Sequence, residues 1–485
     1  MRILTKMGVF VLDKKKPIIE GLERFRQQQN ISFHVPGHKH GELSHLPQAF
    51  KDVMRYDVTE LTDLDDLHYP EGMILEAENL LADTYGAKKS FFLVGGSTVG
   101  NLAMIYATCH KGDTIIVQRN AHKSIFHAIE LVGAKPIFVS PIWDERTLTA
   151  THVTFHDLKE AIDNYSEAKA VVLTYPTYYG VTSNEIQQQI VYCHEKGIPV
   201  LVDEAHGAHF SACHLFQPSA LSFGADVVVQ SAHKTLPAMT MASFMHVKSE
   251  LIDADKIHHY LRMLQSSSPS YVLLASLDDA RYYVQTYMES DGAYIIEKKK
   301  QWVEALRSIG SLEVIEVDDP LKLLLRVDGY SGFQLQEALE AQHVYGELAD
   351  ANQVLLVLPL LKQGHTYPFA EIRVRIKEAI TTLLDTAKTN SKTVSQTAYH
   401  FVPITEPTFT FSEIASLDKE WLPYMRTIGR ISTSMIIPYP PGIPLLVPGE
   451  RITVAKLSQL EELLAAGATF QGNHRLAEKM IQVIK

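Results

Sequence analysis

The sequence predicts an α/β fold in which a mostly parallel sheet is flanked by helices. Short apolar runs rich in β-branched residues recur through the first half of the chain, and such runs are typical of strands buried on both faces of a parallel sheet. Segments with helical spacing of apolar residues separate several of them. Because alternating strands and helices produce parallel sheets covered by helices, this order predicts one large layered domain.

Each element follows from its own pattern. The segment 17–29 has an amphipathic helical pattern, and 73–85 is rich in Ala, Glu and Leu and stops at Gly86, a residue typical of helix ends. A third helix is predicted over 122–131. The predicted strands are 89–94, 114–117, 136–140, 171–175, 200–203, 227–230 and 241–247.

The composition bounds the class of protein. With 485 residues the chain has room for two or three domains, and its 46% hydrophobic content is ordinary for a globular protein. A net charge of −11 argues against nucleic acid as the main partner. No apolar run approaches the length of a membrane span, and the three cysteines lack metal-ligand spacing. We therefore expect a cytoplasmic enzyme without a membrane partner.

A lysine follows one predicted strand at the position where open α/β sheets bind ligands. The apolar run 226–230 is followed directly by Ser-Ala-His-Lys234. Partial loss of solvent at such a position lowers the pKa of the Lys234 ammonium and makes the amine a usable nucleophile. A lysine in a surface loop is the alternative, and the strand that precedes Lys234 argues against it.

The preceding strand ends in a similar way, at Asp203. A buried carboxylate requires a cationic partner or hydrogen-bond donors. A pyridinium nitrogen is one such partner, and the pair of aspartate and pyridinium makes pyridoxal phosphate an electron sink. Two strands that end in Asp203 and Lys234 therefore predict a pyridoxal-phosphate site.

A glycine-rich turn over 95–101 joins a predicted strand to a predicted helix. Such a turn presents backbone N–H groups and the positive end of the helix dipole, both of which bind phosphate. Ser97 and Thr98 add hydroxyl groups. Many glycine-rich loops only reverse the chain, so this assignment depends on the phosphate-bearing cofactor that Asp203 and Lys234 predict.

Five motifs resemble, in the same order, those of the lysine, ornithine and arginine decarboxylase family in its short form. They are His34-Val-Pro-Gly-His-Lys-His-Gly41, Asn120-Ala-His-Lys123, Pro176-Thr-Tyr-Tyr-Gly180, Ser231-Ala-His-Lys234 and the run from Pro438 to Glu450. The resemblance spans nearly the whole chain. It implies an aspartate-aminotransferase-like (type I) fold with a C-terminal α+β domain, pyridoxal phosphate as cofactor, and decarboxylation of a basic amino acid. It also implies a homodimer or larger assembly with interfacial active sites.

The resemblance assigns a role to each matching residue. The implied catalytic residues are Lys234, His233, Asp203 and His122, with the His122 ring stacked on the cofactor and His233 or Lys234 as proton donor. The implied cofactor contacts are Ser97, Thr98, His122, Asp203, Ala205, His206, Ser231, His233, Lys234 and Ser266, with Ser266 or Ser267 reaching the neighbouring subunit. His38 and Glu450 are candidates for contacts with the substrate.

The distal end of the substrate depends on the C-terminal motif. The proline-rich run 436–450 excludes a helix and predicts an extended, rigid loop. Such a loop either holds Glu450 as a fixed carboxylate near a cationic substrate or uses it as a structural brace. Arginine is the favoured substrate, with lysine and ornithine next, and the amine product would feed polyamine biosynthesis.

Two alternatives concern the segment Asp203-Glu-Ala-His206. It also resembles a helicase motif that binds Mg²⁺, but the chain lacks the glycine-rich loop with a lysine that those enzymes need. A zinc site formed by His206, His209 and His214 is disfavoured by their irregular spacing. We therefore expect no metal.

Two further alternatives keep the fold. A different pyridoxal enzyme, such as an aminotransferase or aldolase, commonly holds the α-carboxylate with an arginine. Arginines available for that role are Arg373, Arg375, Arg430 and Arg451. A non-catalytic scaffold is disfavoured because Lys234, Asp203 and His122 are all present.

The predicted domain organisation has four parts. An N-terminal arm comprises 1–70, a large cofactor-binding domain 71–290, a small α/β domain 291–390 and a C-terminal decarboxylase domain 391–485. The polar segment 386–397, rich in Lys, Ser and Thr, is the predicted linker before the last part.

Overall fold

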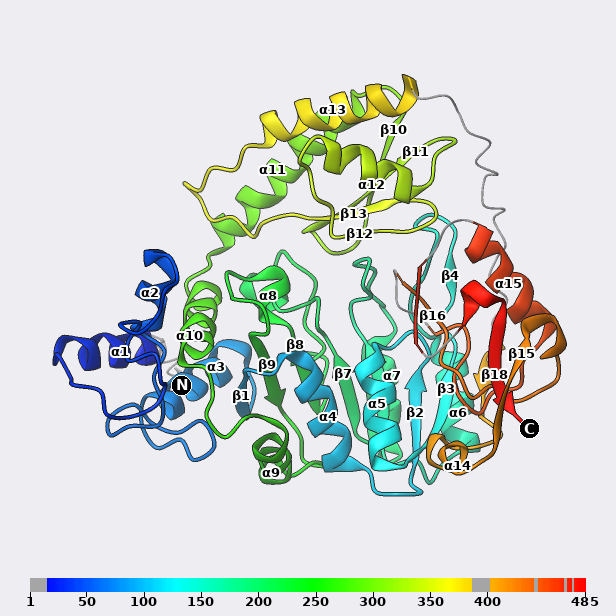
Figure 1. The fold of residues 1–485 in the computed structure, drawn as a ribbon, viewed down its shortest axis with the longest axis horizontal. Helices are drawn as coiled ribbons and strands as arrows, with labels where there is room; N and C mark the ends of the chain where they lie inside the picture. The colour runs from blue at the N-terminus through cyan, green and yellow to red at the C-terminus, as the bar shows by residue number, and fades with distance from the viewer. Residues whose placement is uncertain (1–14, 386–401, 440–443, 466–468, 473–474) are drawn as a thin grey trace, which may run out of the picture.

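An eight-stranded sheet forms the centre of the computed structural model, which describes residues 15–385, 402–439, 444–465, 469–472 and 475–485 (Figure 1). In spatial order its strands are β1 (Lys89–Leu93), β9 (Ser243–Val247), β8 (Val227–Gln230), β7 (Val200–Asp203), β6 (Val171–Thr174), β2 (Thr114–Gln118), β3 (Lys135–Val139) and β14 (Ile404–Thr405). The strands from β8 to β3 are parallel to one another, whereas β9, β1 and β14 join through antiparallel pairs. The predicted mostly parallel sheet is confirmed.

Two layers of helices cover this sheet because side chains alternate between its faces along each buried strand. Phe91 and Leu93 of β1 contribute to the core on one face, and Phe92 contributes to the core on the other. One layer contains α4 (Gly96–Thr108), α5 (Lys123–Val132) and α9 (Ala254–Leu264). The other contains α3 (Met73–Tyr85), α6 (Phe155–Asn164), α7 (Ile186–Glu195) and α10 (Tyr271–Gln285).

The boundaries of the predicted helices are close to the observed ones. α3 occupies the predicted range, and Gly86 ends it with a φ of 69°, a left-handed conformation that glycine adopts at little cost. His122 is the N-cap of α5 and not its first helical residue. The predicted N-terminal helix is α1 (Pro17–Gln27). Short elements complete this part of the chain: α2 (Gln48–Met54), β4 (Trp143–Asp144), β5 (Thr149–Ala150) and α8 (Ala232–Thr235).

A second sheet lies above the large one in Figure 1 and is entirely antiparallel. Its strands, in spatial order, are β10 (Leu312–Glu316), β11 (Lys322–Val327), β13 (Val354–Val357) and β12 (Leu348–Ala349). The accompanying helices are α11 (Glu289–Arg307), α12 (Gly332–Ala341) and α13 (Phe369–Asp385). Tyr179, which follows β6, packs in one apolar cluster with Leu324 and Leu355 of this small sheet. The small sheet therefore rests on the loop that follows β6.

The C-terminal part consists of short antiparallel strand pairs and two helices. The pairs are β15 (Lys419–Pro423) with β18 (Met480–Ile484), and β16 (Ile437–Tyr439) with β17 (Thr469–Gln471). The helices are α14 (Phe411–Ala415) and α15 (Val454–Ala465). The predicted linker 386–397 and residues 440–443 of the predicted proline-rich loop lie outside the described residues.

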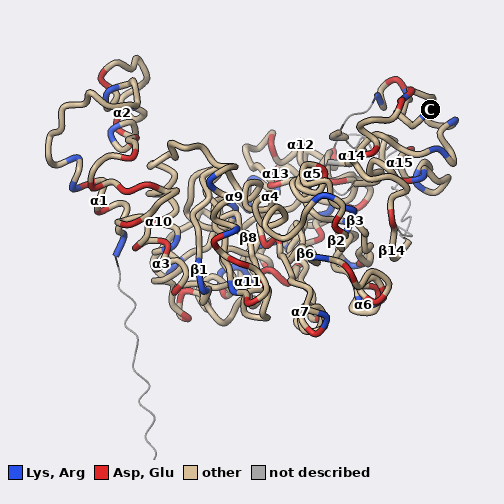
Figure 2. Tube along the Cα trace, turned by 90° about the horizontal axis from the view of Figure 1, so that it is seen from below, with Lys and Arg blue, Asp and Glu red and all other residues tan. Residues whose placement is uncertain are grey.

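Residues 28–54 of the predicted N-terminal arm (1–70), called the arm below, lie at one end of the molecule, apart from the helical layers (Figures 1 and 2). Several of its large apolar side chains face solvent, and Phe33 is 95% exposed. In the described part of the chain, acidic and basic positions are interspersed along the trace (Figure 2). Of the helices that the structure describes, none is both long and apolar enough to cross a membrane.

A buried ion pair attaches the C-terminal part to the large sheet. The side chains of Arg119, which follows β2, and Glu450 are both 4% exposed, and Arg119 Nη2 donates to Glu450 Oε2 at 2.8 Å. Lys456 of α15 donates to the same oxygen at 2.6 Å. Burial alone would raise the pKa of Glu450, but the two cations outweigh it and lower the pKa to about 2. Glu450 is therefore a structural brace, as the second sequence interpretation has it.

Replacing Glu450 with Gln should lower the free energy of unfolding by about 3–5 kcal/mol, because Arg119 would stay buried without a charged partner. The depressed pKa also means that the carboxylate stabilises the fold fully above its ordinary pKa of 4.5, and that this stabilisation is lost as the pH falls towards about 2. Thermal unfolding between pH 7 and pH 3 measures both effects.

The matched control for this variant is Glu371→Gln, which breaks an exposed ion pair with Arg375. It should change the stability by less than about 0.5 kcal/mol. Equal losses in the two variants, or an unchanged pH dependence in Glu450→Gln, would contradict the assignment of Glu450 as a buried brace.

Candidate active site

A cavity of about 260 Å³ lies at the carboxyl ends of the parallel strands. Its volume is near the lower end of the roughly 300–1,000 Å³ typical of small-molecule sites. β1, β2, β6, β7 and β8 run in the same direction, so the chain that leaves each of them reaches this edge of the sheet. Six of the residues that the sequence predicts for the site line the cavity: Ser97, His122, Asp203, Ala205, His206 and Lys234.

Lys234 and His206 meet inside the cavity. β8 ends at Gln230, and the single turn α8 brings Lys234 round so that its Nζ lies 2.9 Å from His206 Nε2. Burial lowers the pKa of the Lys234 ammonium, although the negative charge of Asp203 opposes this effect. Burial and the positive charge of Lys234 hold the pKa of His206 well below its usual range. Neutral His206 can therefore accept a hydrogen bond from Lys234 at neutral pH.

Asp203 is held in a fixed orientation by hydrogen-bond donors. Its Oδ1 accepts from the backbone N–H of Ala205 at 3.1 Å, and its Oδ2 accepts from Asn101 Nδ2 at 2.9 Å. The same Asn101 nitrogen donates to Ser124 Oγ at 2.9 Å. Asp203 is 3% exposed, so its carboxylate has been taken out of water and is directed at the cavity.

His122 belongs to the same network from the opposite wall. His122 is the N-cap of α5. Its Nδ1 accepts a hydrogen bond from the backbone N–H of Ser124 at 3.3 Å and also lies 2.8 Å from Ser124 Oγ. In the neutral ring the proton is therefore on Nε2. Burial lowers the pKa of His122, although the negative charge of Asp203 raises it in part. The net lowering keeps the ring neutral at pH 7. A neutral, oriented imidazole suits a planar aromatic ligand.

The end of the cavity at α4 suits an anion. Ser97 lies in the first turn of α4, and its Oγ accepts from Ser231 Oγ at 2.9 Å, which brings two predicted hydroxyl groups together. The first N–H groups of a helix are directed along its axis and favour negative charge. Thr98 is exposed and does not line the cavity, so of the two predicted hydroxyl residues of this turn only Ser97 faces it.

Besides Thr98, Ser231 and Ser266, the predicted site residues His233, His38 and Glu450 do not line the cavity. His233 precedes Lys234 but turns away, and its Nδ1 is 3.0 Å from the Ala242 carbonyl oxygen. His38 lies in the arm, 3.1 Å from Asp57 Oδ2. Glu450 is committed to Arg119 and Lys456. In the single chain none of the three lines the cavity, so their expected contacts with cofactor or substrate stay predictions.

Ser266 is also distant from the cavity wall, and its side chain is exposed. Its backbone carbonyl accepts a hydrogen bond from His68 Nε2 at 2.8 Å, which ties the segment before α10 to the N-terminal part of the chain. The sequence interpretation places Ser266 at a neighbouring subunit, and that interpretation stays a prediction.

Among the residues at the site that were not assigned from the sequence, Tyr178 and Glu347 matter most. Tyr178 lines the cavity; its ring centroid lies 4.3 Å from that of His206 and 5.3 Å from Lys234 Nζ. Tyr178 Oη donates to Glu347 Oε1 of the small domain at 2.7 Å. From the sequence, the aromatic residues after β6 either line the pocket or pack in the core. Tyr178 lines the cavity. Nothing local to Glu347 indicates a site, because it approaches only through tertiary structure.

The arginines available for an α-carboxylate clamp lie elsewhere. Arg373 donates to the Ala305 carbonyl oxygen, Arg375 pairs with Glu371, Arg430 pairs with Glu420, and Arg451 donates to the Gly429 carbonyl oxygen. Among the residues described around the cavity there is no arginine. The arrangement expected of an aminotransferase is therefore not formed by these side chains.

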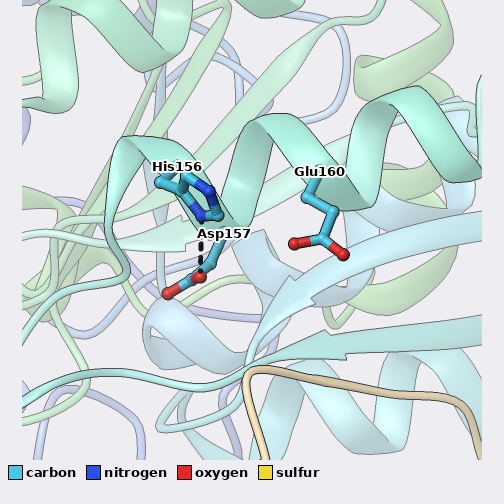
Figure 3. A group of neighbouring side chains, drawn as sticks. All are labelled: His156, Asp157 and Glu160. Carbon is cyan, nitrogen blue, oxygen red and sulfur yellow. Dashed lines mark hydrogen bonds and ion pairs between the residues drawn. The ribbon is translucent and has the colours of Figure 1, made fainter.

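A histidine and two carboxylates come together on α6 (Figure 3). His156, Asp157 and Glu160 offer ligand atoms within 4.8 Å of one another, and His156 and Glu160 are exposed. None of them lines the cavity, and exposed groups of this kind are common without an ion. The alternative zinc set does not converge within the described residues, since His206 contacts Lys234 and His209 contacts Asp319. We assign no metal site.

Comparisons with known proteins address the fold and the family. The model of "Orn/Lys/Arg decarboxylase, major domain" matches residues 16–323, and that of the corresponding "C-terminal domain" matches 389–473. The chain is 45% identical over 479 residues to "Uncharacterized protein YaaO" of Bacillus subtilis, covering 96% of this chain and 98% of the relative. It is 32% identical over 487 residues to an arginine decarboxylase of the same organism, covering 97% and 98%.

A solved structure shows the same fold. The lysine decarboxylase LdcF of Francisella novicida superimposes with a TM-score of 0.79 at 19% identity, covering 98% of this chain and 82% of that one. At this identity the likeness concerns the fold alone. The predicted fold class, a large mostly parallel α/β sheet with a C-terminal domain, is confirmed.

Proposed function

Because the chain belongs to the Orn/Lys/Arg decarboxylase family, we propose that it uses pyridoxal phosphate to decarboxylate arginine, releasing agmatine and carbon dioxide. The observation that carries this proposal is the cavity in which the Lys234 amine, neutral His206 and the Asp203 carboxylate converge. The relatives that are 32% identical and named arginine decarboxylase support arginine over lysine and ornithine. The amine product would feed polyamine biosynthesis, and the cytoplasmic location stays a prediction.

The residues present fit this cofactor. Lys234 would bind its aldehyde carbon, Asp203 would accept a hydrogen bond from the protonated ring nitrogen, and His122 would lie against the ring face. Ser97 and the N-terminus of α4 would hold the phosphate, with Ser231 behind Ser97. When bound, the cofactor supplies an electron sink for the bond that breaks. The fixed carboxylate of Asp203 supports that sink because it favours a protonated ring nitrogen.

The substrate carbon that loses its carboxylate must gain a proton. Lys234 is the group placed to give it, because its Nζ lines the cavity and His206 Nε2 lies 2.9 Å away to exchange protons with it. His233, the other candidate from the sequence, faces the Ala242 carbonyl outside the cavity. We therefore assign proton transfer to the Lys234–His206 pair and not to His233.

Glu347 is the residue best placed to bind the cationic end of the substrate. It is an exposed carboxylate beside the cavity, held by Tyr178 Oη at 2.7 Å. Its negative charge reaches Lys234 and opposes the lowering of the Lys234 pKa by burial. A carboxylate can bind a planar guanidinium through two parallel hydrogen bonds. Asp203, the carboxylate on the described wall of the cavity, already accepts a hydrogen bond from Asn101, so Glu347 is the better candidate.

The decarboxylase assignment is tested by measuring agmatine, cadaverine and putrescine from arginine, lysine and ornithine, each offered separately to the purified protein with pyridoxal phosphate. Agmatine should dominate. Lys234→Ala should abolish the visible absorbance of bound cofactor and lower the rate on the order of a thousandfold or more. Lys248→Ala, at an exposed lysine, is the control and should leave both unchanged. A keto acid in place of an amine would sink the proposal.

The Glu347→Gln variant should raise the KM for arginine on the order of tenfold, equivalent to about 1.4 kcal/mol. With norleucine, which has no distal charge, the variant and the wild type should give the same kcat/KM, because the carboxylate acts only on the cation. Steady-state kinetics with both substrates measure this difference. Glu337→Gln, on the exposed face of α12, is the matched control. A similar loss with norleucine would assign Glu347 a structural role instead.

We further propose that the protein is a homodimer in which the N-terminal arm packs on a second copy. Ile31, Phe33 and Leu43 of the arm are 84%, 95% and 68% exposed in the single chain. Large apolar side chains that face solvent on one segment support a protein–protein contact there. The predicted reach of Ser266 to a neighbouring cofactor is part of the same proposal.

Phe33→Glu should shift the protein from dimer to monomer by placing a charge in the interface. Sedimentation velocity at several concentrations measures the change, and Leu131→Glu, at a residue 62% exposed on α5 outside the arm, is the control. The proposal is wrong if the wild-type protein is monomeric, or if both variants behave alike.

A further inference from the structure

A cluster of three ionisable side chains is buried behind the cavity. His209, Asp319 and Lys322 are all 0% exposed. His209 Nε2 lies 2.9 Å from Asp319 Oδ1, and Lys322 Nζ lies 3.7 Å from Asp319 Oδ2. His209 belongs to the loop after β7, whereas Asp319 and Lys322 belong to the small domain at the start of β11. The cluster therefore joins the small domain to the part of the large domain that carries the site.

The cluster holds the segment that contains Tyr178. Lys322 Nζ donates to the Tyr178 carbonyl oxygen at 2.8 Å, and the Asp319 backbone N–H donates to the Gly180 carbonyl oxygen at 2.9 Å. Gly180 has a φ of +87°, and a Cβ added there would lie 2.7 Å from Lys322 Cδ and 2.8 Å from Asp319 Cβ. The close approach of Lys322 and Asp319 thus requires glycine at 180.

The fixed backbone of Tyr178 places its ring in the site. The ring is 4.3 Å from the His206 ring, centroid to centroid, and Lys234 Nζ is 5.3 Å from its centroid. Its hydroxyl donates to Glu347. A shift of the Tyr178 carbonyl would therefore be transmitted to both members of the proton-exchanging pair.

Burying these charges is costly, and an apolar side chain at 322 could brace the loop without that cost. We propose that Lys322 is a positioning residue of the active site, which fixes Tyr178 against the Lys234–His206 pair and maintains a positive charge behind that pair. The inference rests on the proposed function, because it assigns a task to residues that act on Lys234. It extends that function to a charged group that contacts neither cofactor nor substrate.

The charges that face Lys322 support this role. Burial lowers the pKa of the Lys322 ammonium to about 8, with Asp319 and Glu347 opposing the change and Lys234 adding to it. The positive charge of Lys322 in turn favours the neutral form of the basic group His206. After burial and Lys234, it is the next largest cause of the low pKa of His206. Loss of the charge should therefore raise the pKa of His206.

The test compares Lys322→Met with a double variant, Lys322→Met with Asp319→Asn, in which the carboxylate charge is removed as well. In the single variant Asp319 is left as a buried charge without Lys322, and the protein could fail to fold. The double variant removes that charge as well, so the same measurements can be made on a folded protein. Lys248→Met, at an exposed lysine, is the matched control.

The first readout is the titration of the His206 ring by NMR in the protein without cofactor, with the signal assigned by its loss in His206→Gln. In the folded Lys322 variants its midpoint should rise by about one pH unit. The second readout, with pyridoxal phosphate and arginine, is a fall in kcat on the order of tenfold with little change in KM. A purely structural brace would lower the melting temperature and move neither quantity.

The outcomes separate the two proposals. An unmoved His206 midpoint, or an unchanged kcat, in a folded variant overturns the role of Lys322. Absence of amine formation by the wild-type protein overturns the proposed decarboxylation, while a raised His206 midpoint in the cofactor-free variants would still support electrostatic control of the pair by Lys322.

Discussion

The shared direction of β1, β2, β6, β7 and β8 is the constraint on which the candidate site depends. Neighbouring strands lie only about 4.8 Å apart, so residues at their carboxyl ends form one continuous surface although they are distant in sequence. Asp203 and Lys234 meet there because β7 and β8 are adjacent and parallel. Asn101 then connects Asp203 with the Ser124–His122 end of the site. The parallel sheet thus brings the residues of the site together, and the single turn of α8 after β8 carries Lys234 into the cavity.

The small domain and the C-terminal part both attach to loops at this edge. Lys322 binds the segment after β6, and Glu450 binds Arg119, three residues before His122. Each contact uses a charged group that is almost completely withdrawn from water, where an unpaired charge is strongly destabilising. The small domain and the C-terminal part therefore each fix one loop of the site. Breaking either contact would leave a buried charge without a partner, which is strongly destabilising.

The residues that were predictable from the sequence are those whose signal is local. Asp203, Lys234 and Ser97 each follow a recognisable strand, and the parallel order brings strand ends together. His233 shows the limit of this reasoning. It is adjacent to Lys234, but consecutive residues in a helical turn point about 100° apart, so that only one of the two faces the cavity.

The residues that sequence reasoning missed or misplaced depend on distant partners. Glu450 is separated from Arg119 by 331 positions, and no spacing rule indicates that a carboxylate in a proline-rich run will be buried against a strand end. Tyr178 and Lys322 are 144 positions apart, and Glu347 reaches the site only through the packing of the small domain. The pattern of apolar and polar residues predicts which face of a helix or strand is buried. It does not identify the residue from another part of the chain that contacts that face.

The position of β1 at the edge of the sheet has a consequence for how the protein is made. Of the strands that the structure describes, only β9 pairs with β1, and Lys89 lies opposite Val247. During synthesis β1 therefore has no strand partner until the chain has been extended past Val247, and closing so long a loop is slow compared with local helix formation. The turn with Ser97 follows β1 directly. The end of the cavity at Ser97 is thus completed late, after β7 and β8 have been synthesised.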